Sequence, residues 1–139
     1  ICACLVGSEM CIRDRAYKDY SILGHLDVIK RYDLNGEIEL EKIKDLIEQI
    51  FEVVIADGKG IELNTSSRAY HLKSLMPSRE ILELYHDMGG KIITIGSDAH
   101  NADRVGDRVM ESQKILKEIG FNGIYTFDQM KPKFHEFKF

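Results

Sequence analysis

The residues best suited to chemistry are Gly96-Ser97-Asp98-Ala99-His100, which directly follow an apolar run. They place a carboxylate and an imidazole two residues apart. In an extended stretch both side chains point to the same side, as two ligands of one divalent metal would. An isolated Asp-x-His is more often a turn in which the aspartate caps the backbone. Here the position after a strand, with two further polar clusters expected at the same edge, favours a metal site.

A lone histidine, His25, stands in Gly24-His25-Leu26-Asp27 at the end of another predicted strand. Such a histidine is more often a hydrogen-bonded packing residue than a ligand. Because His25 lies at the end of a predicted strand, both roles stay open. Glu62 is predicted to point to the inside of a sheet. An unpaired carboxylate there costs several kcal/mol, so Glu62 requires a partner, either a cation such as lysine or hydrogen-bond donors.

The run Asn64-Thr65-Ser66-Ser67-Arg68 supplies hydroxyls, backbone amides and a guanidinium within five residues. This chemistry suits a phosphate group. Without the neighbouring sites, an ordinary polar loop would be the better interpretation.

The elements that would position these residues alternate between strands and helices. The predicted strands are 20–24, 60–64, 91–96 and 123–127, and the predicted helices are 37–56, 78–88 and 105–119, with a brief turn or helix over 28–32. The helix over 37–56 is the clearest, because its apolar residues fall on one face at 3.6 residues per turn. The strand over 91–96 is predicted to be buried on both faces. The tail, 128–139, has no assignment.

This order predicts an α/β fold in which helical crossovers make the strands parallel. The fold is either an open parallel sheet or part of a β/α barrel. His25, Glu62 with Asn64, and Ser97 to His100 all fall near the carboxyl ends of successive strands. In both architectures ligands bind at that edge.

Composition limits the classes of protein that remain. The chain has 139 residues, of which 44% are hydrophobic and 30% charged, as expected for one modest domain. No apolar run reaches the roughly 18 residues of a membrane-spanning helix. The net charge of −4 offers no basic patch for nucleic acid. Neither a membrane nor a nucleic acid is therefore expected as a partner.

All three cysteines, Cys2, Cys4 and Cys11, stand in the first 11 residues, so they are no disulfide framework. Residues 1–15 have no periodicity, caps or signal-peptide pattern. Back-translated, residues 4–14 resemble the reading frame of a sequencing adapter. We therefore expect residues 1–15 to be non-native, with residues 16–139 forming the domain and, being free of cysteine, suited to the cytoplasm.

Three segments together resemble the C-terminal half of a histidinol-phosphate phosphatase of the PHP superfamily. These segments are Gly24 to Tyr32, Glu62-Leu63-Asn64-Thr65-Ser66, and Gly96 to His100 with Val105-Gly106 behind it. They stand in the family's order, and the resemblance covers 17–139. Ser67 stands where many relatives have glycine.

The resemblance implies a distorted seven-stranded β/α barrel with several divalent metals, zinc, manganese or iron, at its carboxyl edge. His25, Asp98 and His100 match metal ligands of the family and would be its catalytic residues. Arg31 and Arg68 match phosphate-binding positions, and Asn64 and Ser66 would assist in substrate binding. The family's opening His-x-His motif, bridging glutamate and further histidines belong upstream of Tyr17, and nothing in residues 1–19 replaces them.

The implied reaction is the hydrolysis of L-histidinol phosphate to L-histidinol and phosphate in histidine biosynthesis, by a metal-activated water. Two alternatives stay open. The protein could be another PHP phosphoesterase that acts on nucleotides or DNA ends. It could also be a non-catalytic half-barrel, whose open strand edges and apolar interior would favour self-association.

Overall fold

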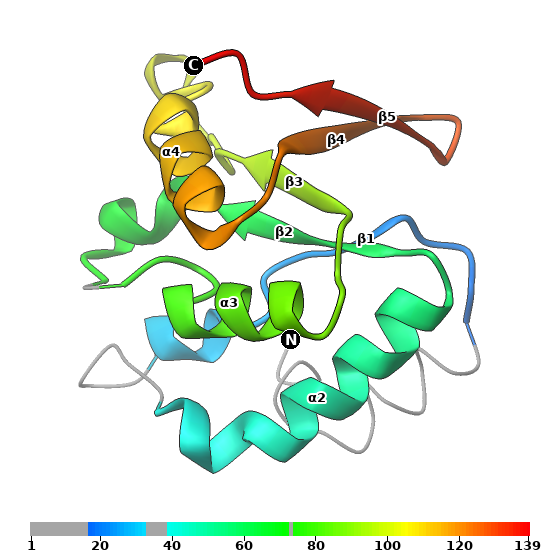
Figure 1. Ribbon diagram of the computed structural model, residues 1–139. Coiled ribbons are helices and arrows are strands. Elements are labelled where there is room, and N and C mark those ends of the chain that lie inside the picture. The colour runs from blue at the N-terminus through cyan, green and yellow to red at the C-terminus, as the bar shows by residue number, and fades with distance from the viewer. Residues whose placement is uncertain (1–16, 33–38, 73) are drawn as a thin grey trace.

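The computed structural model describes residues 17–32, 39–72 and 74–139 of the chain (Figure 1). The predicted non-native segment, residues 1–15, lies outside the described residues. No helix in the described part is both long enough and apolar enough to span a membrane.

A three-stranded parallel sheet forms the centre of the fold, in the order β1-β2-β3. Its strands are β1 (Ile22–Leu23), β2 (Gly60–Asn64) and β3 (Ile93–Gly96). Leu23 pairs with Ile61, and Asn64 pairs with Gly96. The predicted parallel arrangement of these strands is confirmed, and β2 has the predicted bounds.

Three α-helices connect or follow the strands, as expected for parallel crossovers. They are α2 (Leu40–Ala56), α3 (Arg79–Asp87) and α4 (Val109–Ile119). Short 3₁₀ helices lie between them: η2 (Val28–Arg31), η3 (Thr65–Tyr70) and η4 (Ala102–Arg104). Figure 1 shows α2 and α3 together on one side of the sheet. The brief turn or helix predicted over 28–32 is confirmed, because η2 spans Val28–Arg31.

The core lies between β2 and the helices. Ile61 and Leu63 are fully buried on the helix-facing side of β2, and they belong to one apolar cluster with residues of all three α-helices. The predicted apolar face of α2 supplies its buried residues, Ile47, Ile50, Phe51 and Val54. Because side chains alternate along a strand, Glu62 and Asn64 belong to the opposite face of the sheet.

The end of α2 shows how the chain turns from helix to strand. Gly58 has a φ of 64°, which is a left-handed conformation that favours glycine. Its amide donates to the Ile55 carbonyl at 3.0 Å, and the Lys59 amide donates to the Val54 carbonyl at 2.9 Å. These two bonds form a Schellman motif, which satisfies the last carbonyls of the helix and leads directly into β2.

The fourth predicted strand does not join the parallel sheet, so that part of the prediction is wrong. β4 (Gly123–Asp128) pairs antiparallel with β5 (Lys131–Glu136), and the two form a separate two-stranded sheet. Gln129 and Met130 connect them with φ values of 48° and 63°. Two successive positive φ values are typical of a type I′ turn, which makes a tight hairpin from the tail.

Two further expectations need correction. The predicted helix over 105–119 begins at Val109, because Gly106 and Arg108 have positive φ values that interrupt a right-handed helix. The predicted double-sided burial of β3 is wrong as well: Ile93 is buried, and the rest of the strand is half-buried. β3 is an edge strand of the described three-stranded sheet, so it has one strand neighbour in its ladder.

Tyr85 gives a test of the packing between α3 and the sheet. Its hydroxyl donates to the Ile92 carbonyl at 3.0 Å, and its ring packs on Phe51 with the centroids 5.0 Å apart. Burial raises the pKa of Tyr85 to about 12, from an ordinary value of 10.0. Folding therefore favours the neutral form of the Tyr85 phenol.

Tyr85→Phe should lower the free energy of unfolding by about 1 kcal/mol at neutral pH, because one hydrogen bond is lost. Because the folded state keeps the phenol proton to a higher pH than the unfolded state does, wild-type stability should fall relative to the variant above about pH 10. Denaturant unfolding from pH 7 to 11 measures both effects, with exposed Tyr17→Phe as the control. A stability difference that does not vary with pH would contradict this account.

Candidate functional site

The carboxyl ends of the three parallel strands meet at one edge, which we call the carboxyl edge. The strand register places Leu23 beside Ile61 and Asn64 beside Gly96. The segments that follow the strands therefore start close together. The predicted common edge for the three polar segments is confirmed by this register.

Two of the predicted metal ligands have an unusual backbone conformation at this edge. His25 has a φ of 53° and Asp98 a φ of 48°. Positive φ values are uncommon outside glycine, although histidine and aspartate tolerate them best, and they cluster at functional sites. The Nδ1 atom of His25 is buried and has no hydrogen-bond partner among the described residues. The backbone geometry thus favours a functional role for His25 and Asp98.

His100 is turned back toward its own loop. Its side chain is 76% exposed, and its Nδ1 lies 2.9 Å from the Asp98 carbonyl oxygen and 3.9 Å from the Asp98 Oδ1 atom. A carbonyl oxygen only accepts hydrogen bonds, so Nδ1 is the protonated nitrogen in this arrangement. Nε2 then keeps the lone pair that a metal could use.

The predicted metal ligands do not form a complete site. Within residues 17–32, 39–72 and 74–139, no three His, Cys, Asp or Glu side chains are grouped so that they could hold a metal ion. His25, Asp98 and His100 supply nitrogen and oxygen donors suited to zinc, but they fit it only as part of a ligand set. Their assignment as metal ligands stays a prediction.

Glu62 lies between the two neighbouring strands on the face away from the helices. A Cβ atom added to Gly24 would lie 3.3 Å from Glu62 Oε2, and one added to Gly96 would overlap Glu62 Oε1. The two glycines therefore leave the space that the carboxylate occupies. The side-chain Nδ2 of Asn64 donates to Glu62 Oε2 at 3.4 Å, so the predicted need for a partner is met at least in part by a hydrogen-bond donor.

Asn64 and Ser66 hold the turn from β2 into η3. Both are buried, and the Asn64 Oδ1 atom accepts hydrogen bonds from the Ser66 amide at 2.9 Å and the Ser66 hydroxyl at 2.6 Å. This is an Asx-type turn, in which the side chain satisfies backbone donors. The predicted polar loop is therefore a 3₁₀ helix with inward-facing hydroxyls. A substrate contact by either residue stays a prediction.

The two predicted phosphate-binding arginines have defined places along the chain. Arg31 is the last residue of η2, and Arg68 lies within η3. The positions of their side chains lie outside what the structure describes. In chain order η2 comes after β1 and η3 after β2, so each arginine belongs to a segment that follows one of the parallel strands. The contact of either arginine with phosphate stays a prediction.

Hydrogen bonds link the segments that follow β2 and β3. The Thr65 hydroxyl donates to the Asp107 carbonyl at 2.7 Å, and the Gly106 amide donates to the Ser97 hydroxyl at 3.3 Å. The loop before α4 thus contacts both segments. It fixes the position of one relative to the other at the carboxyl edge.

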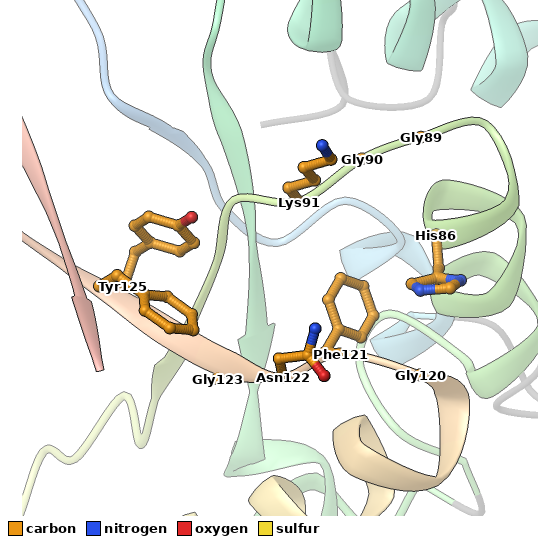
Figure 2. Close-up of a pocket in the computed structure, with 10 residues that line it drawn as sticks. His86, Gly89, Gly90, Lys91, Gly120, Phe121, Asn122, Gly123 and Tyr125 are labelled. Carbon is orange, nitrogen blue, oxygen red and sulfur yellow. The ribbon is translucent and has the colours of Figure 1, made fainter. Parts of the chain in front are cut away.

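Two cavities lie outside this predicted ligand set. One of about 490 Å³ lies beside η3 and is lined by residues that include Ser67, Arg79 and Arg108. Another, of about 320 Å³, lies at the amino ends of β3 and β4 (Figure 2), and His86 and Phe121 pack edge to face on its wall. Neither cavity was predicted from the sequence, where the glycines after α3 and α4 were the available signal for the second one.

Comparisons with known proteins agree with the motifs. No protein-family model matches the chain. The chain is 35% identical over 102 residues to a probable histidinol-phosphatase of Thermotoga maritima, a match that covers 73% of this chain and 42% of the relative. It is 28% identical over 118 residues to the histidinol-phosphatase of Lactococcus lactis, covering 83% and 43%. The chain is similar to part of a histidinol-phosphatase.

A solved structure supports the fold. The crystal structure of histidinol phosphate phosphatase from Lactococcus lactis, in complex with zinc, L-histidinol and phosphate, matches with a TM-score of 0.76. The match has 23% sequence identity and covers 91% of this chain and 49% of that one. This chain thus spans less than half the length of these histidinol-phosphatases, and its described residues show a parallel three-stranded α/β fold without a closed barrel.

The contact between Gly96 and Glu62 can be tested directly. Gly96→Ala should lower stability by about 1 kcal/mol, because the new methyl group displaces the carboxylate. In a Glu62→Ala background the same change should cost nothing, since the obstructing atoms are gone. A double-mutant cycle from denaturant unfolding measures this coupling. Gly24→Ala is the matched control and should cost less, and equal costs of Gly96→Ala in both backgrounds would exclude the contact.

Proposed function

We propose that this chain is part of a metal-dependent histidinol-phosphatase, which hydrolyses L-histidinol phosphate to L-histidinol and phosphate in histidine biosynthesis. The observation that carries the proposal is the shared carboxyl edge, where the motif segments with His25 and Asp98 follow β1 and β3, the two parallel strands that flank β2. The names of the curated relatives and the ligands of the Lactococcus lactis structure support it.

The three parallel strands would be part of a larger barrel of the distorted seven-stranded β/α type. Two features support this proposal. The helices cover the Ile61 and Leu63 side of β2, as in the outer layer of a barrel, while Glu62 and Asn64 belong to the inner side. The solved neighbour is about twice as long as this chain, since the match covers 49% of it.

His25, Asp98 and His100 would hold divalent metal, together with ligands from the rest of the protein. The zinc in the Lactococcus lactis complex supports zinc as the metal, and a cluster of several ions, or manganese or iron, stays a prediction. When bound, a divalent metal would supply positive charge toward the phosphate oxygens and lower the pKa of water. The hydrogen bond from His100 Nδ1 to the Asp98 carbonyl would orient the ring and leave Nε2 for the metal.

Arg31 and Arg68 would bind the phosphate group of the substrate. A guanidinium offers paired donors that fit phosphate oxygens, and its charge would offset the negative charge that redistributes as the ester bond breaks. η2 and η3 would present the two arginines from neighbouring segments of the carboxyl edge. Asn64 and Ser66 would act by fixing the start of η3, in line with their mutual hydrogen bonds.

Self-association of this chain stays a second proposal. Among the described residues, β1 and β5 each have an edge without a strand partner, and all six residues of β5 are exposed. Unpaired edges favour contact with another copy or with the rest of a barrel. A cytoplasmic location and a small phosphorylated metabolite as the partner belong to the first proposal, that of a histidinol-phosphatase.

Two variants separate the metal role from the phosphate role. They are best made in a chimera in which residues 17–139 replace the matching segment of the Thermotoga maritima relative. Asp98→Ala should remove bound metal and lower kcat/KM on histidinol phosphate by at least roughly 100-fold. Arg68→Ala should raise KM by roughly 10- to 100-fold, the worth of a charged hydrogen-bond pair, and leave metal content unchanged.

Elemental analysis and phosphate release measure these effects, with exposed Asp103→Ala and Arg79→Ala as the matched controls. An Asp98→Ala chimera with full metal content and full activity would refute the metal assignment. Equal loss of metal and substrate binding in Arg68→Ala would refute the phosphate role. A wild-type chimera that loads metal but prefers nucleotides or DNA ends would favour another PHP phosphoesterase.

A further inference from the structure

An ion pair is buried directly behind the carboxyl edge. Asp27 and Lys30 are 2% and 1% exposed, and the Lys30 Nζ atom lies 2.8 Å from Asp27 Oδ2. Lys30 also donates to the Ser74 hydroxyl at 3.2 Å and to the Leu75 carbonyl. The three hydrogens of the ammonium group are therefore all used inside the protein. A lysine so enclosed cannot reach a substrate, and its role must be exerted through its neighbours.

The pair joins two distant parts of the chain. Asp27 Oδ2 also accepts a hydrogen bond from the Ser78 amide at 3.0 Å, and Ser78 is the N-cap residue of α3. The carboxylate thus satisfies the backbone amide of the N-cap residue. Through these bonds η2 is fixed both to the segment before α3 and to the residue that caps that helix.

The pair does not have the features of a strong stabilising contact. The Asp27 Oδ1 atom is buried and has no hydrogen-bond partner among the described residues. Buried ion pairs of this kind can often be replaced by apolar residues without loss of stability. The role of the pair is therefore better explained by the segments that it holds in position.

We propose that Asp27 and Lys30 are positioning residues that lock η2 in place at the carboxyl edge. His25 precedes η2 and Arg31 ends it, so the pair lies between a predicted metal ligand and a predicted phosphate-binding residue along the chain. The Val28 amide donates to the His25 carbonyl at 3.0 Å, which ties η2 to that residue. The consequence for substrate binding rests on the proposed function, while the locking of η2 does not.

The test removes both charges together in the full chain. Asp27→Leu with Lys30→Met should lower the midpoint of thermal unfolding less than either single change does, because no unpaired charge is left. Hydrogen exchange at the amides of residues 28 and 30 should become at least tenfold faster. The affinity for inorganic phosphate, measured by calorimetry on the zinc-loaded chimera with the Thermotoga maritima relative, should fall about tenfold when the chimera carries the same two changes. The matched control is Glu39→Leu with Lys42→Met, an exposed pair of the same spacing.

Unchanged exchange in a stable double variant would overturn the proposal. Faster exchange in the full chain, together with a wild-type chimera that binds no phosphate, would support the locking of η2 and count against the proposed function. If the double variant unfolds, Ser74→Ala decides, since it removes one acceptor of Lys30 and leaves both charges. About threefold faster exchange at residues 28 and 30 would then support the proposal, and exchange at the wild-type rate would overturn it.

Discussion

Parallel pairing of β1, β2 and β3 in one register is the constraint on which the rest of the structure depends. Because the strands run in the same direction, the segments that follow them all begin at one edge. This arrangement brings His25, η3 and Asp98 together although they are far apart in the sequence. Hydrogen bonds from the loop before α4 then connect the segments after β2 and β3. The site is thus a product of strand direction first and of loop contacts second.

The two faces of β2 have different roles: one packs in the core, and the other holds polar side chains. The face with Ile61 and Leu63 is covered by the helices and forms the core. The other face holds the Glu62 carboxylate, for which Gly24 and Gly96 leave room. A side chain at position 96 would overlap the carboxylate, and one at position 24 would contact it tightly. The glycines before His25 and Ser97 thus have a packing reason.

Periodicity was sufficient to predict α2, β2 and the parallel sheet, because burial on one face leaves a regular pattern in the sequence. The hairpin of β4 and β5 could not be predicted in this way: its turn is formed by Gln129 and Met130, without the Asn-Gly pair typical of type I′ turns. At the carboxyl edge, motif and strand position were sufficient to predict that His25 and Asp98 follow β1 and β3, and their roles as ligands stay predictions. The pair Asp27 and Lys30 was missed, since an acidic and a basic residue three apart do not reveal that both are buried.

The central claim is that zinc binds at the carboxyl edge through imidazole and carboxylate. X-ray absorption at the zinc edge of the metal-loaded chimera with the Thermotoga maritima relative tests it most directly, because the rest of the ligand set is present there. The account predicts nitrogen and oxygen ligands at about 2.0–2.2 Å, with imidazole scattering that decreases in His25→Ala. Sulfur ligands at about 2.3 Å would contradict it. A spectrum that His25→Ala does not change would contradict it as well.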